Sequence, residues 1–171
     1  MRFDVVTLFP EIFSAVRDCG ITARARMRGL WSINCWNPRD TATDLHRTID
    51  DRPFGGGPGM VMMAEPLAQT IDAVRASGNC GRVLSFAPNG ARLTDARVRE
   101  IAAAKEPIVL VCGRYEGIDE RFLESYVDEV VSLGDFVLSG GELPACALID
   151  AVVRQLPGAI KDLSASDESF A

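Results

Sequence analysis

Residues 108–117, IVLVCGRYEG, run a short apolar segment directly into a loop bounded by glycines. Residues 127–142, VDEVVSLGDFVLSGGE, repeat the arrangement further along the chain. Apolar runs of this length that end in glycine are typical of strands buried in a sheet. Ligands of open α/β sheets bind at the carboxyl ends of the strands, where glycine lets the backbone approach closely. We therefore expect one ligand cleft there, suited to a nucleotide-like molecule.

Strand-like and helix-like segments alternate around these two stretches. We expect strands at residues 2–8, 31–36, 82–86, 108–112 and 127–132. We expect helices at residues 11–18, 23–29, 66–76, 94–105, 119–126 and 143–155. The turn residues 87–90 should end the third strand, and the last helix is apolar on most faces, which predicts burial against the sheet or another subunit. The alternation predicts an α/β domain with a mainly parallel sheet.

Composition limits the classes of partner. A chain of 171 residues with 47% hydrophobic content is long enough for one domain with a core. Its net charge of −6 argues against binding nucleic acid by bulk electrostatics alone. Several arginines nevertheless cluster in residues 24–47, and arginine suits phosphates and base edges. Solvated surface charges remain the alternative interpretation of that cluster.

The cysteine and histidine content argues against a metal site. The five cysteines are scattered without a Cys-x-x-Cys pair, and His46 is the single histidine. An odd number of cysteines and the lack of a signal peptide favour reduced thiols in the cytoplasm. No apolar run approaches the roughly 20 residues of a membrane span, so we expect a soluble cytoplasmic protein with no membrane partner.

Residues 37–59 form a long polar and then glycine-rich segment that we interpret as a functional loop. Its run Gly55 to Gly59 is not followed by the Gly-Lys-Ser/Thr of a phosphate-binding loop. No Gly-x-Gly-x-x-Gly follows the first strand either, which argues against a dinucleotide-binding dehydrogenase.

Four segments carry a more specific signal when they are read together. They are residues 8–13 (LFPEIF), 50–60 (DDRPFGGGPGM), 113–121 (GRYEGIDER) and 133–144 (LGDFVLSGGELP). In this order and spacing they closely resemble the bacterial tRNA (guanine-N1)-methyltransferases, and the resemblance covers essentially the whole chain. These enzymes methylate the guanosine immediately 3′ of the anticodon, using S-adenosyl-L-methionine.

The resemblance implies a SPOUT-type α/β fold, with a mainly parallel sheet, helices on both faces and a deep C-terminal trefoil knot. Sequence reasoning alone would have predicted an unknotted chain. Residues 1–160 would form the catalytic domain and residues 161–171 a linker, because family members continue into a C-terminal tRNA-binding domain. We therefore expect a fragment that binds cofactor but methylates tRNA poorly. Family members are homodimers with the active site at the subunit interface.

The resemblance also implies which residues hold the cofactor. Three loops, at residues 85–90, 113–117 and 133–141, would lie side by side around it. The predicted cofactor-binding residues are Pro88, Gly113, Tyr115, Glu116, Gly117, Leu133, Gly134, Asp135, Phe136, Val137, Leu138, Gly140, Gly141 and Pro144. An adenine ring needs apolar walls and a few amide partners, which these residue types supply.

Methyl transfer to guanine N1 needs a base near N1 and positive charge near the six-keto oxygen. Arg154 matches the family's arginine for the second role, and a guanidinium keeps its charge at any working pH. The family's base precedes Ser-Phe, which indicates Glu168, with Asp167 as the alternative. A carboxylate is a weak base for this proton, so its pKa must rise or the transfer must be concerted.

His46, Asp50 and Pro58 match substrate-binding positions near the target guanine. A dependence on magnesium stays open, as does the tRNA species preferred. Two other functions also stay open: a cofactor-binding dimer module without full activity, and a SPOUT enzyme that modifies another RNA base.

Overall fold

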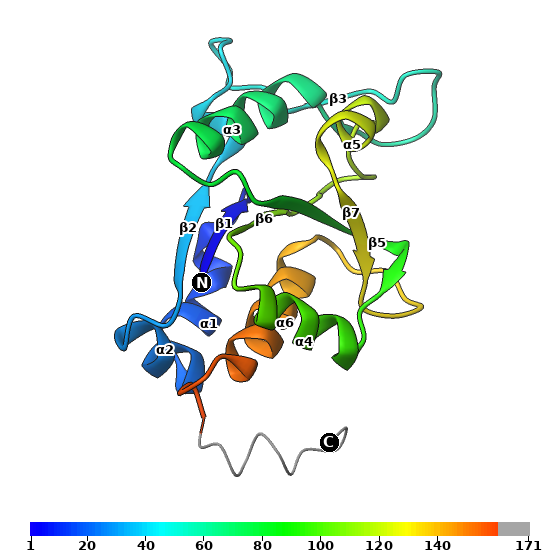
Figure 1. Cartoon of the computed structure of the whole chain (residues 1–171). Helices are drawn as coiled ribbons and strands as arrows, with labels where there is room; N and C mark the ends of the chain where they lie inside the picture. Colours follow the sequence, from blue (N-terminus) through cyan, green and yellow to red (C-terminus); the bar gives the residue numbers. More distant parts are fainter. Residues whose placement is uncertain (161–171) are drawn as a thin grey trace.

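The computed structural model describes residues 1–160, which form layers of helices around a five-stranded sheet (Figure 1). The strands are β1 (Arg2–Val6), β2 (Ser32–Trp36), β5 (Arg82–Arg92), β6 (Ile108–Val111) and β7 (Glu129–Ser132). Their order is β2-β1-β6-β5-β7, and every neighbouring pair is parallel. A separate antiparallel pair joins β3 (Asp50–Asp51) to β4 (Val61–Met62). The predicted α/β fold with a mainly parallel sheet is confirmed.

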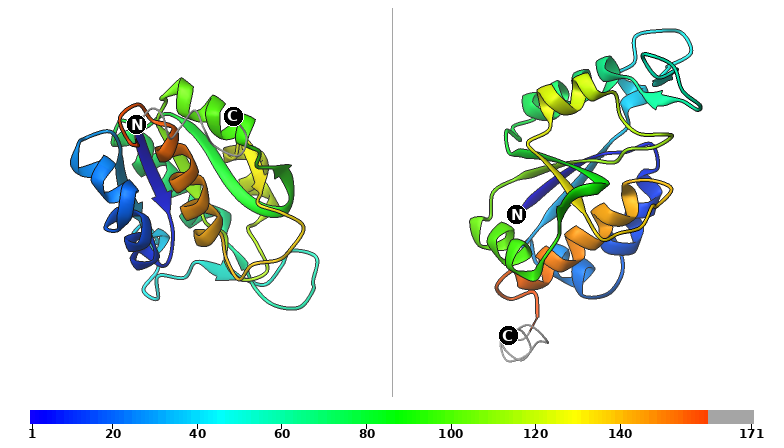
Figure 2. Two further views of the ribbon diagram at one scale, coloured as in Figure 1. Left: turned by 90° about the horizontal axis from the view of Figure 1, so that it is seen from below. Right: turned by 90° about the vertical axis from the view of Figure 1, so that its right-hand side faces the viewer.

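Helices cover both faces of the sheet (Figure 2). On one face lie α3 (Ala64–Ala76) and α5 (Glu120–Tyr126), and on the other lie α1 (Ser14–Arg17), α2 (Gly20–Met27), α4 (Asp95–Ala104) and α6 (Glu142–Gln155). Short 3-10 helices occur at Pro10–Phe13 and Pro38–Asp40. Neighbouring strand residues point to opposite faces, so that Val5 and Leu110 join the core under α6 while Val6 and Val111 join the core under α3. Burial on both faces explains why these strands read as continuous apolar runs.

The predicted end of the third strand is wrong, and two smaller boundaries differ as well, because β1 ends at Val6 instead of residue 8 and α2 spans Gly20–Met27 instead of 23–29. Strand β5 does not end at residue 86 but continues through the turn-like residues to Arg92, with a register shift between Phe86 and Ala91 against β7. Gly90 lies so close to the neighbouring strand that a Cβ there would come within 2.5 Å of the Val130 carbonyl oxygen. Phe86 and Ala91 both pair with Val131, so residues 87–90 form an irregular bulge in a strand that stays paired on either side of it, and they do not end the strand.

A buried carboxylate ties the first strand to its neighbours. The fully buried side chain of Asp4 accepts hydrogen bonds from Arg2 (2.6 Å), Asn79 (2.7 Å), Trp36 (2.8 Å) and Asn34 (3.1 Å). Burial by itself raises the pKa of Asp4, but the hydrogen bonds, led by that from Arg2, outweigh burial and hold the pKa below its ordinary value. The ionised carboxylate is thus part of the folded core.

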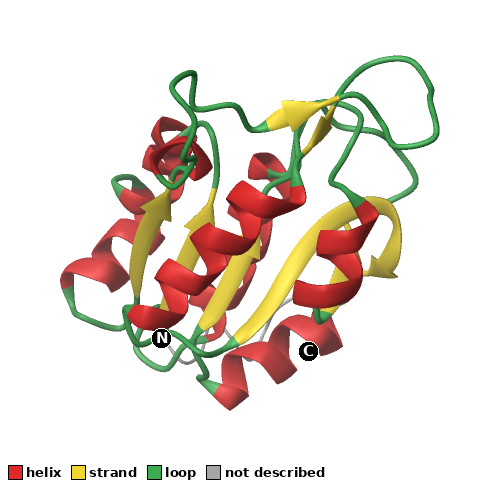
Figure 3. Ribbon diagram, turned by 90° about the horizontal axis from the view of Figure 1, so that it is seen from above, coloured by secondary structure: helices red, strands yellow, loops and turns green. Residues whose placement is uncertain are grey.

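Helix α6 runs along the sheet from the carboxyl ends of the strands toward their amino ends. At its start, the Gly141 N–H donates to the Gly113 carbonyl at the carboxyl end of β6. Just beyond its end, Arg28 donates to the Gly158 carbonyl, next to α2. Figure 3 shows the strand arrows pointing toward the edge where the β3–β4 hairpin lies. The trefoil knot implied by the resemblance is consistent with this arrangement.

Candidate functional site

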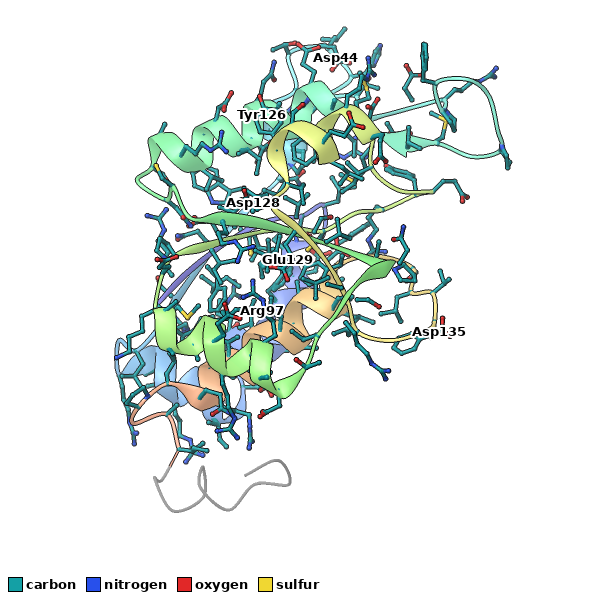
Figure 4. All side chains as sticks on the ribbon, turned by 45° about the vertical axis from the view of Figure 1, so that its right-hand side comes forward. Asp44, Arg97, Tyr126, Asp128, Glu129 and Asp135 are labelled. Atoms are coloured by element: carbon teal, nitrogen blue, oxygen red, sulfur yellow. The ribbon has the colours of Figure 1, made fainter. Side chains whose placement is uncertain are left out.

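Three loops meet at the carboxyl edge of the sheet and enclose a cleft of about 250 Å³. The loops follow or interrupt β5, β6 and β7, which are neighbours in the sheet although they are distant in sequence. All the predicted cofactor residues except Asp135 line this cleft, namely Pro88, Gly113, Tyr115, Glu116, Gly117, Leu133, Gly134, Phe136, Val137, Leu138, Gly140, Gly141 and Pro144. Asp135 is exposed at the outer end of the 133–141 loop (Figure 4).

One wall of the cleft is unusually apolar for a solvent-facing loop. Phe136, Val137 and Leu138 are consecutive and remain 54%, 85% and 37% exposed. Apolar side chains gathered around a concave surface mark ligand sites, because a bound ring buries them. The 133–141 segment therefore has the chemistry of a wall for a flat, apolar group.

The 113–117 loop carries a strained residue. Tyr115 has a φ of 58°, which side-chain-bearing residues rarely adopt and which persists only where the surroundings enforce it. Its hydroxyl has a raised pKa, mainly because of partial burial and then because of the negative charge of Asp50, with Arg39 acting in the opposite direction. The structure thus brings Asp50, a predicted substrate-binding residue, next to a residue of the cleft.

Backbone hydrogen bonds fix the β3–β4 hairpin to the same loop. Glu116 N–H donates to the Met60 carbonyl and Met62 N–H to the Gly117 carbonyl, each at 2.9 Å. Pro58 is exposed in the connection between β3 and β4. His46 is exposed in the segment before β3 and does not line the cleft. The structure therefore couples the hairpin to the cleft but does not bring His46 into it.

Sequence reasoning missed a buried ion pair behind the cleft. Arg114 Nε donates to Glu142 Oε2 at 2.9 Å, and Glu142 is only 1% exposed. The hydroxyl of Thr7, at the end of β1, donates to the other carboxylate oxygen at 2.9 Å. The sequence did contain a signal for this pair. Glu142 directly follows two glycines and begins an apolar helix, which favours burial of its carboxylate, and a buried charge requires a partner.

Arg154, the one predicted catalytic residue that the structure describes, is not at this cleft within one chain. Arg154 lies in the last turn of α6, about 15 Å along the helix axis from Pro144. It is not among the residues that line the cleft. Glu168 and Asp167 fall outside the described residues, as does the predicted linker at 161–171.

The cysteines near the cleft are poor nucleophiles. Complete burial raises the pKa of Cys112 well above its ordinary value, and the charge of Glu142 adds to this effect. Partial burial, again with Glu142, raises the pKa of Cys146 to about 11. Both thiols therefore stay protonated at neutral pH, which leaves no thiolate for covalent chemistry. Residues 1–160 also contain no group of three His, Cys, Asp or Glu side chains arranged to hold a metal ion, and no helix long and apolar enough to cross a bilayer.

Comparisons with known proteins agree on one family. The family model described as tRNA (Guanine-1)-methyltransferase TrmD matches residues 1–171. A tRNA (guanine-N(1)-)-methyltransferase from Thiobacillus denitrificans is 60% identical, and one from Pseudomonas syringae pv. tomato is 56% identical. Each alignment covers 99% of this chain, and 74% and 68% of the respective relative. The crystal structure of tRNA (m1G37) methyltransferase from Aquifex aeolicus superimposes with a TM-score of 0.86 and 41% identity, over 95% of this chain and 72% of the other. The chain belongs to the tRNA (guanine-N1)-methyltransferase family.

Proposed function

We propose that the cleft binds S-adenosyl-L-methionine and that the chain uses it to methylate N1 of the guanosine immediately 3′ of the tRNA anticodon. The observation that carries this proposal is a single cleft formed by three loops at the carboxyl ends of neighbouring parallel strands, in a tRNA (guanine-N1)-methyltransferase. The cytoplasm, where tRNA is modified, is the expected location.

The residues of the cleft fit this donor. The exposed side chains of Phe136, Val137 and Leu138 offer an apolar wall for adenine. Glu116, which also lines the cleft, can accept a hydrogen bond from a ribose hydroxyl or face a cationic sulfur. When bound, the donor supplies an electrophilic methyl group on a sulfonium, whose cleavage leaves a neutral thioether.

The chain's own residues then have two tasks. A carboxylate, Glu168 in our proposal and Asp167 otherwise, takes the proton from N1 so that a lone pair becomes available there. The guanidinium of Arg154 donates to the six-keto oxygen, where negative charge accumulates. Removing a preorganised donor of this kind typically slows a reaction about a hundredfold or more.

We infer that a second copy of the chain supplies Arg154 to the cleft. Arg154 is near the end of α6 farthest from its own cleft. The same helix exposes Leu143 and Ala147 on one side, followed by Asp150, and an exposed apolar side chain beside a small one suits packing against another copy. We therefore propose a homodimer in which each cleft receives Arg154 from the other chain.

Transfer of a labelled methyl group to tRNA transcripts tests the reaction. We expect transfer to a transcript with guanosine 3′ of the anticodon and none when adenosine replaces it. Transfer to the adenosine transcript would indicate a different target base. Binding of the donor mimic sinefungin without any transfer would favour a cofactor-binding module.

The choice of base has its own test. Substituting Glu168→Gln should abolish transfer and leave sinefungin affinity unchanged, while the matched variant Asp167→Asn should remain active. The reverse pattern would assign the role to Asp167.

Mixing two inactive variants tests the shared site. Arg154→Ala removes the guanidinium, and Leu138→Lys places a positive charge in the cleft, so neither homodimer should methylate tRNA. A mixed dimer contains one intact cleft facing one intact Arg154, so random exchange should restore about a quarter of wild-type activity. Activity that stays at background in the mixture would place Arg154 at the cleft of its own chain.

A further inference from the structure

Arg114, which itself lines the cleft, contacts three separate segments. Its Nε donates to Glu142 at the start of α6, and its Nη1 donates to the Ser139 carbonyl at 3.2 Å. Its guanidinium carbon also lies 4.4 Å from the centre of the Phe9 ring, which is within range of a cation–π contact. Arg114 itself belongs to the 113–117 loop, so one side chain connects two walls of the cleft to the segment after β1.

The buried partner makes this connection stiff. Glu142 has no access to water, and its two oxygens are satisfied by Arg114 and by the hydroxyl of Thr7. A buried carboxylate that loses its cation is strongly destabilised, so the pair resists separation. The planar guanidinium also donates in fixed directions, which a lysine ammonium cannot reproduce.

Gly140 has a role in the same arrangement. A Cβ on Gly140 would lie 2.3 Å from Arg114 Nε and 2.6 Å from Arg114 Cζ. The missing side chain thus makes room for the guanidinium, independently of any ligand. Gly140 lines the cleft, so the position of Arg114 and the shape of that wall are set together.

We propose that Arg114 is a positioning residue that, through Glu142, Ser139 and Phe9, holds the 113–117 and 133–141 loops at the separation required to bind the methyl donor. This inference rests on the proposed assignment of the cleft as the donor site. Although Arg114 lines the cleft, its role in this proposal is to position the loops through these contacts and not to act on the reacting atoms.

Calorimetric titration with sinefungin, paired with urea unfolding, tests the proposal. Arg114→Ala should weaken sinefungin binding by about tenfold or more and lower the stability of the fold. Adding Glu142→Gln to Arg114→Ala removes the unpaired buried charge, so stability should recover while affinity stays low. A purely structural role for Arg114 predicts instead that affinity and stability return together, and that result would overturn the proposal.

A second cycle uses Gly140. Gly140→Ala should weaken binding by about tenfold in the wild-type background, but by less than about threefold when Arg114→Ala has removed the colliding group. Equal losses in both backgrounds would contradict the proposed contact. Arg121→Met is the matched control, because Arg121 lies on the surface in an exposed ion pair with Asp119, and it should bind sinefungin normally.

The outcomes separate the two proposals. A wild-type protein that does not bind sinefungin would refute the assignment of the cleft. Wild-type binding together with unchanged affinity of the Arg114→Ala variant would refute only the positioning role.

Discussion

Replacing Gly141 by alanine tests whether the glycines of the cleft serve the chain or the ligand. Gly141 has φ −79° and ψ −6°, a conformation that alanine adopts without strain. A Cβ there would nevertheless lie 2.8 Å from the Cys112 Cα and 3.0 Å from the Gly113 nitrogen, both of which are backbone atoms. Because carbon atoms pack at about 3.5–4.0 Å, the two segments must separate by roughly 1 Å.

The energetic cost follows from that separation. Overpacking of this kind costs about 1–3 kcal/mol, and stretching the 2.9 Å hydrogen bond from Gly141 to Gly113 costs about 1 kcal/mol more. The lower chain entropy of alanine in the unfolded state returns about 0.4–1 kcal/mol. We therefore expect Gly141→Ala to lower the free energy of unfolding by about 2 kcal/mol, and to weaken donor binding because both segments line the cleft.

Urea unfolding followed by tryptophan fluorescence measures this loss. Gly113→Ala is the matched control, because the nearest atoms to its added Cβ belong to the Ile118 side chain, at 3.4 Å. The control should lie within about 0.5 kcal/mol of wild type. A Gly141→Ala variant as stable as that control would refute the steric argument.

Three further predictions concern buried groups. Substituting Asp4→Ala removes the acceptor of four donors, of which Asn79 is fully buried, and should cost about 2–3 kcal/mol of unfolding free energy; a loss below about 1 kcal/mol would contradict the structural role of this carboxylate. Because folding lowers the pKa of Asp4, its stabilisation is complete above the pKa of the unfolded carboxyl and is lost as the pH falls through the folded value; urea titrations from pH 7 to 3 should therefore show a slope that Asp4→Asn reduces. With a thiol reagent at pH 8, exposed Cys19 should react at once, the partly exposed Cys146 with its raised pKa should react slowly, and Cys112 should react only after unfolding; fast labelling of Cys112 would contradict its burial.

The sheet could be predicted from sequence because its central strands are buried on both faces. All four residues of Ile108–Val111 are buried, so the strand appears in the sequence as four consecutive apolar residues. Glycines directly after such runs also located two of the three loops of the cleft. Both signals lie within a few consecutive residues, so they can be read without knowing which distant segments come into contact.

The limits of prediction lie where distant segments decide the outcome. Nothing within residues 87–90 reveals that Gly90 packs on the backbone of Val130 and keeps the strand paired. Likewise, Arg114 and Glu142 are 28 positions apart, and each alone reads as a solvated charge. The position of Arg154 relative to the cleft follows from the direction of α6 across the sheet, which the sequence of the helix does not specify.

The contacts of the cleft glycines assign them a different role from the one predicted from sequence. Sequence reasoning assigned them to close approach of a ligand, but Gly134 makes room for the Phe136 ring, Gly140 for Arg114, and Gly141 for the backbone at Cys112. Each of these contacts joins the 133–141 segment to itself or to the end of β6. The shape of the cleft therefore depends on side chains and backbone of the protein itself packing directly against these glycines at the carboxyl edge of the sheet. Tightly packed interiors respond to displacement as units and not by local yielding, so a donor site built on such contacts is as rigid as the core that supports it.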